Sequence, residues 1–311
     1  MVIPNDLLRE IKRRSRPPAF ASGLKEAVQE LIKRYPGVEA VLFYGSCLEK
    51  GNLYDGLVDL YLLVQSYQLA YRHPFLVWAN RLLPPNVFYY QRTDHQTLRI
   101  KYAVMELDHF RKATSWRWFH SYFWGRFCQP AVLLYASESG RKAALEALAQ
   151  AVLTFLTRTI PMVPPKGRLE ELWLTGLKLS YRAELRPEPG GRIEELWQKA
   201  REHFTAVTRA AAPAIPFPFE VRGDSYQAEV PRSLKRRESW AWRLRLIQGK
   251  LLSVLRLSKA AFTFQGGVDY ALWKIERHRG IRLEVSPFFR RHPLLALFLL
   301  GWRVIRLGGV R

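Results

Sequence analysis

The chain has little cysteine and no long, uninterrupted apolar run. Its two cysteines, Cys47 and Cys128, exclude a disulfide framework and a cysteine-rich metal site. No window holds the roughly 20 consecutive apolar residues that a membrane-spanning helix needs. Residues 1–18 lack the apolar core of a secretory signal, and we interpret their basic run, residues 12–16, as a solvated arm. These absences predict a protein that faces a reducing, cytosolic compartment.

Acidic residues are also scarce. The 311 residues include 49 Lys and Arg but only 27 Asp and Glu, which gives a formal net charge of +22. A charge of this size predicts a polyanionic partner, either nucleic acid or an anionic membrane. Residues 232–311 hold 18 of the basic residues and 4 of the acidic ones. Because the charge gathers at one end beside apolar segments, we expect an anionic membrane surface and consider nucleic acid the weaker alternative.

The chain is nevertheless rich in apolar and aromatic residues, at 48% and 13%, which excludes a disordered protein. An amphipathic pattern over residues 23–35 predicts a helix that ends before Pro36 and Gly37. Apolar runs predict strands after this helix, at residues 38–44, 58–64, 87–90 and 98–106. The order of these elements predicts a small mixed sheet backed by helices, and therefore an α+β fold.

From about residue 116 the pattern turns helical, with long helices predicted over residues 141–158, 168–185, 193–211 and 239–261. We predict three parts: a sheet domain over residues 1–135, a mainly helical domain over 136–260, and a basic amphipathic segment over 261–311. The last long helix carries an apolar stripe formed by Trp240, Leu244, Ile247, Leu251 and Leu255. We interpret this stripe as facing the core, with the basic residues of the helix toward solvent.

A Gly-Ser turn after an apolar strand is the most informative motif. Gly45 and Ser46 follow Tyr44 at the end of the first strand, and Asp59 comes thirteen residues after Ser46, inside the second strand. A glycine lets the backbone approach phosphate oxygens, and the serine adds a hydroxyl donor. An aspartate on the neighbouring strand is suited to Mg²⁺ that neutralises phosphate charge. The motif predicts the triphosphate site of a nucleotidyltransferase-like sheet; the alternative is an ordinary turn beside a strand-edge acid.

Two basic residues later in the chain stand among apolar neighbours. Lys101 lies in the middle of the strand over residues 98–106, where it either binds an anion or occupies a sheet edge. Arg126 lies between Gly125 and bulky apolar residues, where it either forks onto a phosphate or pairs with a core carboxylate. The residues leave both alternatives open.

A second metal-binding acid is harder to find. Polymerase-like nucleotidyltransferases carry one two residues after the first, and here that position is Tyr61. Asp55 is a possible substitute, although Gly56 places it in a turn, and Glu106 is another candidate. A single strand acid predicts a site in which the triphosphate supplies much of the coordination of the metal.

Four segments in the same order resemble one known family. They are Tyr44-Gly45-Ser46, Val58-Asp59-Leu60, Lys101-Tyr102-Ala103-Val104, and Gly125-Arg126 followed by Gln129-Pro130. The chain is similar here to the mitochondrial translocator assembly and maintenance protein family of phosphatidate cytidylyltransferases, the CDP-diacylglycerol synthases, of which bacterial relatives exist. A weaker echo lies in Phe264-Gln265-Gly266-Gly267. Ala103 in place of glycine and Gln129 in place of lysine depart from the family pattern.

The resemblance implies an enzyme that transfers CMP from CTP to phosphatidic acid with Mg²⁺ and releases pyrophosphate. It assigns the nucleotide to Tyr44, Gly45, Ser46, Lys101 and Tyr102. It assigns the metal to Asp59, in keeping with the single aspartate of the family pattern; Asp55 stays the second candidate from the residues alone. By the same resemblance, Asp59, Lys101 and Arg126 form the catalytic set, with Arg126 orienting one of the two anions.

The C-terminal residues fit a catalyst that works on a lipid. An apolar block over residues 293–302 ends in Trp302 and has arginines on both sides, as in a helix that lies in a membrane interface. We therefore expect a peripheral protein on the cytoplasmic face of a bacterial inner membrane, held by residues 288–311. The alternatives are a nucleotidyltransferase that acts on RNA or another nucleotide acceptor, and a catalytically idle membrane-binding relative. The sequence predicts no oligomeric state.

Overall fold

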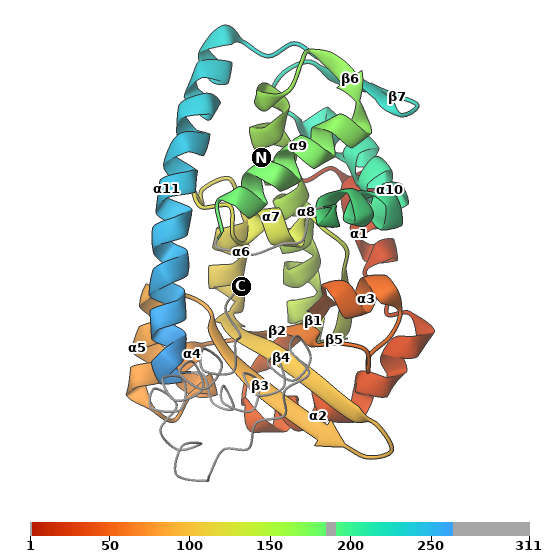
Figure 1. The fold of residues 1–311 in the computed structure, drawn as a ribbon. Coiled ribbons are helices and arrows are strands. Elements are labelled where there is room, and N and C mark those ends of the chain that lie inside the picture. Colours follow the sequence, from red (N-terminus) through yellow and green to blue (C-terminus); the bar gives the residue numbers. More distant parts are fainter. Residues whose placement is uncertain (1, 185–190, 264–311) are drawn as a thin grey trace, which may run out of the picture.

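A five-stranded mixed sheet forms the lower half of the protein in Figure 1. The computed structural model describes residues 2–184 and 191–263. The strand order is β3-β4-β2-β1-β5; β2 and β4 run parallel, and the other neighbours are antiparallel. The strands are β1 (Val38–Tyr44), β2 (Val58–Val64), β3 (Asn86–Thr93), β4 (Thr97–Glu106) and β5 (Ala131–Ala136). All but one residue of β1 and of β2 are buried, which explains why their sequences are nearly continuous apolar runs.

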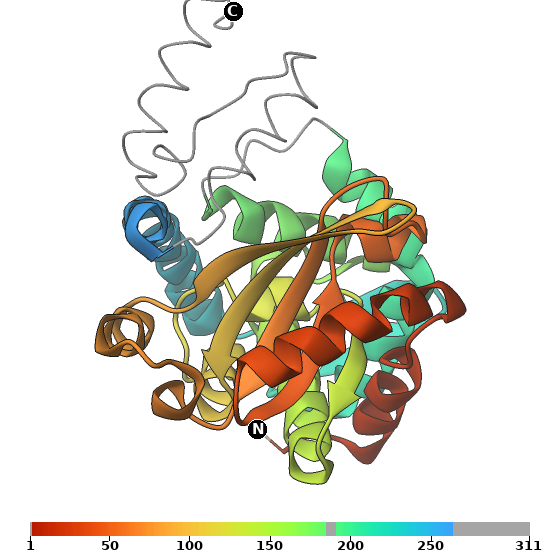
Figure 2. The ribbon, with the colours of Figure 1, turned by 90° about the horizontal axis from the view of Figure 1, so that it is seen from below.

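Helices cover both faces of this sheet. On one face, α2 (Lys25–Arg34) lies across the sheet, as Figure 2 shows. Its buried residues belong to the same cluster as Phe43 and Leu60. On the other face, Leu42 and Leu63 join the core around α8 (Glu138–Thr159). The shorter elements of this half are η1 (Ala19–Leu24), α3 (Ser46–Lys50), α4 (Tyr67–Ala70), α5 (Pro74–Leu82), α6 (Leu107–Thr114) and α7 (Trp124–Phe127).

The second half of the described chain is mainly helical, as the sequence predicts. It contains α9 (Leu169–Arg182), α10 (Arg192–Ala211) and α11 (Arg232–Thr263), with the short turns η2 (Ile160–Met162) and η3 (Ala212–Ala214). A small antiparallel sheet of β6 (Lys166–Arg168), β8 (Ser225–Ala228) and β7 (Phe219–Arg222) lies at the far end. The α+β class with a mixed sheet and a helical region is therefore confirmed.

One apolar core joins the two halves. It contains Leu42 and Tyr61 from the sheet together with Leu153, Trp173 and Phe204 from the helices. The predicted boundary at residue 135 therefore crosses a shared core, and the division into domains stays a prediction. The third predicted part, residues 261–311, lies almost entirely outside the described residues.

The central helix of this core is long and apolar. Within the part of the chain that the structure describes, the stretch Glu138–Met162 alone has the length and composition of a membrane span. However, 78% of its most apolar window is buried inside the protein. We therefore interpret α8 as the helix around which the core packs.

The N-terminal residues form a helix, and the expected solvated arm is wrong. α1 (Asn5–Arg14) buries Leu7 and Ile11 against the core while Arg9 and Arg13 stay exposed. The sequence did not predict this helix, because only two apolar positions anchor it and both precede the basic run. Much of the basic run over residues 12–16 is therefore the end of an amphipathic helix.

The apolar stripe of the last helix is exposed, and its interpretation as a core face is wrong. Trp240, Leu244, Ile247, Leu251 and Leu255 all lie on the solvent side of α11. The buried side carries Trp242 and Arg245 instead, and the guanidinium of Arg245 donates to the carbonyl of Phe119 at 2.9 Å. An ordinary surface helix buries its apolar face. α11 instead exposes its apolar stripe to solvent.

Gly140 is where α8 approaches the first strand most closely. A Cβ atom on this residue would lie 2.2 Å from the carbonyl oxygen of Glu39, which is a backbone atom that cannot rotate away. We expect Gly140→Ala to lower the free energy of unfolding by about 1–3 kcal/mol. Thermal unfolding followed by circular dichroism measures the change.

Gly23→Ala is the matched control for that substitution. Its new methyl group would meet the flexible Leu53 side chain, with Cδ1 at 3.0 Å. A loss of stability for Gly140→Ala no larger than that of the control would contradict the close approach of α8 to β1.

Candidate active site

The Gly-Ser bend and the strand aspartate lie against each other. β1 ends at Tyr44, which pairs in register with Asp59 of the antiparallel strand β2. Gly45 follows with a φ of 86°, in the left-handed region that side chains rarely adopt. A Cβ atom on Gly45 would lie 2.9 Å from Oδ2 of Asp59. The absence of a side chain at residue 45 is therefore what lets the bend and the carboxylate meet.

Lys101 completes this contact from the neighbouring strand. Asp59 pairs with Lys101 in the parallel register of β2 and β4, and Nζ of Lys101 forms an ion pair with Oδ1 of Asp59. β4 lies between β3 and β2, so the alternative that Lys101 occupies a sheet edge is wrong. The side chains of Lys101 and Asp59 are 31% and 17% exposed, and Oδ1 of Asp59 itself is buried, so the ion pair is largely shielded from solvent.

Tyr44 and Arg126 form a second, deeper layer beside the bend. Nη1 of Arg126 donates to Oη of Tyr44 at 3.3 Å, and Nη2 donates to Oε2 of Glu184 at 2.9 Å. The guanidinium lies 4.5 Å from the ring centroid of Tyr122. Arg126 is therefore paired with a core carboxylate, which was one of the two alternatives from the sequence.

The electrostatics of this layer keep the tyrosine neutral and the arginine charged. The pKa of Tyr44 is raised to about 12, mainly by burial and to a smaller extent by the nearby charge of Asp59. Burial disfavours the charge of Arg126, but Tyr122 and Glu184 more than offset it and hold its pKa above the ordinary value. Tyr44 thus remains a hydrogen-bonding hydroxyl between a cation and the Asp59 carboxylate.

The structure does not bring Tyr102 to this site. Neighbouring strand residues point to opposite faces, so Tyr102 lies on the other side of the sheet from Lys101. Its Oη lies 3.1 Å from Oη of Tyr35, and its ring packs against Phe88 with centroids 5.4 Å apart. In this arrangement Tyr102 belongs to the core beneath α2.

Asp55 and Glu106, the candidates for a second metal ligand, have other partners. Asp55 lies on the exposed loop between α3 and β2, where its carboxylate is 3.9 Å from Nζ of Lys50. Oε1 of Glu106 accepts a hydrogen bond from the backbone N–H of Tyr67 at 2.7 Å. Neither contact directs the carboxylate toward Asp59.

Asp59 is therefore the acid on which a metal would depend. The described residues contain no group of three or more His, Cys, Asp or Glu side chains suited to a metal ion. The Lys101 ammonium already occupies one oxygen of the Asp59 carboxylate, which shows that this position accepts a cation. The donor set fits Mg²⁺ held by one carboxylate together with substrate phosphates and water, a common arrangement for this ion.

Three residues that sequence reasoning missed surround the deeper layer: Glu184, Tyr122 and Arg256. The guanidinium of Arg256, from α11, lies 4.0 Å from the ring centroid of Tyr122. Its Nε donates to the carbonyl of Pro84 at 3.0 Å. Arg256 stands in a strongly basic helix and Glu184 follows the end of α9, so no local pattern in the sequence distinguishes either residue.

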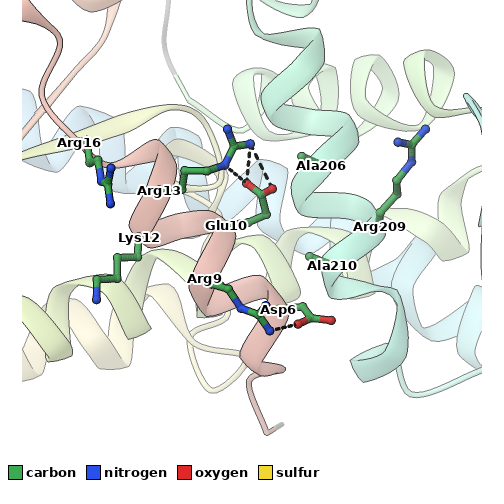
Figure 3. Close-up of a pocket in the computed structure, with 9 residues that line it drawn as sticks. All are labelled: Asp6, Arg9, Glu10, Lys12, Arg13, Arg16, Ala206, Arg209 and Ala210. Atoms are coloured by element: carbon green, nitrogen blue, oxygen red, sulfur yellow. Dashed lines mark hydrogen bonds and ion pairs between the residues drawn. The ribbon is translucent and has the colours of Figure 1, made fainter.

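A separate groove lies between α1 and α10, away from the predicted site residues. It has a volume of about 860 Å³ and is lined by Asp6, Arg9, Glu10, Lys12, Arg13, Arg16, Ala206, Arg209 and Ala210 (Figure 3). Its two acids pair with arginines of the same helix, Asp6 with Arg9 and Glu10 with Arg13. The remaining basic side chains give the groove a positive charge.

Comparison with known proteins identified no relative of this chain. No protein-family model matches the chain, and no curated protein matches it. The resemblance to phosphatidate cytidylyltransferases therefore stays a prediction that rests on four short segments.

Proposed function

We propose that the protein is a phosphatidate cytidylyltransferase with a nucleotidyltransferase-like sheet. It transfers CMP from CTP to phosphatidic acid at a membrane surface and releases pyrophosphate. The observation that carries the proposal is the contact between the Gly45 bend and the Asp59 carboxylate, with Lys101 on the adjoining strand. These three residues supply a phosphate cradle, an acid and a basic group at one place.

Each residue has a role that its position supports. The backbone of Gly45 and the hydroxyl of Ser46 bind triphosphate oxygens at the end of β1. Lys101 binds the same phosphates as a point charge, and Asp59 would hold the magnesium ion that accompanies the nucleotide. Held there, the ion would supply neutralisation of phosphate charge. Arg126, which is fixed by Glu184, holds Tyr44 in place beneath the bend.

The reaction needs little proton transfer. A phosphate oxygen of phosphatidic acid forms a bond to the α-phosphorus of CTP, and the bond from that phosphorus to the bridging oxygen of pyrophosphate breaks. The nucleophile is already an anion, so a general base is not required. Positioning and charge neutralisation therefore supply most of the rate, and the site needs only the groups described above.

The lipid acceptor places the protein at a bilayer. We propose a peripheral position on the cytoplasmic face of a bacterial inner membrane, supported by the net charge of +22. The apolar block at residues 293–302, to which the sequence assigns this contact, lies outside the described residues. The weaker family resemblance at residues 264–267 also lies outside the described residues.

A direct assay tests the proposal. Purified protein incubated with CTP, Mg²⁺ and phosphatidate vesicles is expected to form CDP-diacylglycerol and pyrophosphate in equal amounts. Omitting phosphatidate is expected to abolish pyrophosphate release. Absence of the lipid product, under conditions where the protein sediments with the vesicles, would contradict the proposal and favour a catalytically idle relative.

A second candidate function is nucleotidyl transfer to RNA. The positively charged groove between α1 and α10 favours it, because the four arginines and one lysine that line it suit a phosphate backbone. The same assay with RNA in place of phosphatidate distinguishes the two. Labelled nucleotide incorporated into RNA, without lipid product, would favour this second function.

A further inference from the structure

The outer side of α11 is apolar along most of its length. Trp240, Ile247 and Leu251 are 64%, 69% and 59% exposed, and the side chains of Leu244 and Leu255 beside them are also exposed. The stripe from Trp240 to Leu255 is about 22 Å long at the usual rise per residue. A continuous apolar face of this length on a soluble surface marks an interaction site.

The inner side of α11 explains why this helix does not bury its stripe. It is held by polar contacts, chiefly to main-chain carbonyls. Arg256 donates to the carbonyl of Pro84, and Nζ of Lys259 donates to the carbonyls of Leu83 and Pro85, the latter at 2.8 Å. Rotating the helix to bury the stripe would break these bonds and leave the buried cations without partners. The apolar face is therefore held outward.

α5 extends the apolar surface at the lower end of α11. Its Trp78 and Leu82 are 61% and 63% exposed and stand one helical turn apart. The residues that follow α5 accept the hydrogen bonds from Arg256 and Lys259, so the two helices are neighbours, as Figure 1 and Figure 2 show. α5 therefore adds exposed apolar side chains close to the lower end of α11.

The charges around this surface are of one sign. Arg236, Arg243 and Lys250 are exposed on α11, next to the stripe. The single acid of the side chains described for α11, Glu238, is buried and pairs with Arg245 at 3.0 Å. α5 contains no acid. Two copies packed through this surface would bring like charges together, whereas an anionic layer would attract them.

We propose that the α11 stripe and the exposed side of α5 dock the protein on an anionic lipid bilayer. The apolar side chains enter the interface, and the flanking arginines and lysine contact lipid phosphates. The proposal deepens the membrane-facing function above by naming a surface within the described residues. Its test uses neither CTP nor phosphatidate, so it can fail while the proposed activity stands, and the reverse.

The first test replaces two residues of the stripe. Full-length protein carrying Ile247→Asn and Leu251→Asn is expected to bind roughly ten-fold or more weakly to vesicles of equal parts phosphatidylglycerol and phosphatidylcholine. Tyr54→Asn with Tyr135→Asn is the matched control, because it removes two exposed aromatic side chains from other surfaces. Co-sedimentation measures binding, and circular dichroism checks the fold. Unchanged binding of the stripe variant, or equal loss in the control, would overturn the proposal.

The charge of the surface has a separate test. Arg243→Gln with Lys250→Gln is expected to weaken binding to the same vesicles by roughly five-fold per residue. Binding to pure phosphatidylcholine should be weak for both proteins and unaffected by the substitutions. Equal binding of the wild-type protein to the two kinds of vesicle would overturn the choice of an anionic bilayer.

A fluorescent label reports the docking surface directly. Both native cysteines are buried, so a thiol dye reacts selectively with Ile247→Cys or with the control Tyr54→Cys. On vesicle addition, the emission of the dye at residue 247 is expected to shift to the blue, and that at residue 54 is expected to stay constant. Emission that is already blue before vesicles are added would show that a second copy or another part of the chain covers the stripe, and would overturn the proposal.

Discussion

Asp59→Asn is expected to lower the rate of CDP-diacylglycerol formation by about 10²- to 10³-fold. The amide keeps the shape of the side chain but removes the negative charge that faces Lys101 and that would hold the metal in the proposed enzyme. The carboxylate is mostly buried, so the variant is also expected to lose stability, by up to about 3 kcal/mol, and thermal unfolding separates this loss from the loss of activity. Initial rates of pyrophosphate release at saturating CTP measure the effect, and vesicle binding should equal that of the wild type.

Asp55→Asn is the matched control for this prediction. Its carboxylate lies on an exposed loop beside Lys50, so its loss is expected to leave the rate within about two-fold of the wild-type value. The comparison also decides whether Asp55 is a second metal ligand, the possibility that its place in the sequence left open. A wild-type rate for Asp59→Asn would remove the basis of the proposed function.

Gly45→Ala is expected to abolish measurable transfer. The new methyl group would lie 2.9 Å from Oδ2 of Asp59 and would fill the space that phosphate oxygens need at the bend. The backbone would also be strained, because alanine disfavours the φ of 86° at this residue. Lipid product formation and CTP binding by calorimetry are the measurements, and both should be lost.

Gly51→Ala separates the effect of backbone strain from that of the contact with Asp59. Gly51 has a φ of 67°, but the atom nearest to its missing Cβ is Cε1 of Phe20, at 3.8 Å. Gly51→Ala should therefore cost about 1–2 kcal/mol of stability through backbone strain. Gly45→Ala should cost at least as much, because its ψ of −166° places residue 45 in a region that only glycine adopts readily. Only Gly45→Ala should lose activity. Equal activity in the two variants would mean that the bend at Gly45 does not contact the nucleotide.

The sheet could be predicted from the sequence where a strand is buried on both faces. β1 and β2 occupy the predicted residues, because a continuous apolar run bounded by Gly and Pro has few other interpretations. β5 was missed because its apolar run follows a segment rich in aromatic residues that favours a helical interpretation. Most of that segment is irregular, with α7 alone forming a short helix.

The orientation of α11 shows a second limit of the sequence. Periodicity identified a helix with an apolar stripe, but it cannot say whether the stripe faces protein or solvent. The partners that orient this helix are carbonyl groups, such as those of Phe119 and Pro84, and every residue has one. No pattern of side chains can signal such a contact.

The candidate site likewise contains one contact that the sequence predicts and one that it does not. Gly45 and Asp59 are joined by one strand pair, so their spacing predicts their contact. Arg126 and Glu184 are 58 residues apart, and their pairing depends on how α7 and α9 pack. The sequence indicated an arginine in apolar surroundings and left its partner open.

In the proposed enzyme, the ion pair between Lys101 and Asp59 would prevent a free divalent ion from binding alone, because the lysine already neutralises the aspartate. A polyphosphate would offer the ammonium group a more strongly charged partner and would release the aspartate for the metal. Loading of the metal would then be coupled to the arrival of the nucleotide.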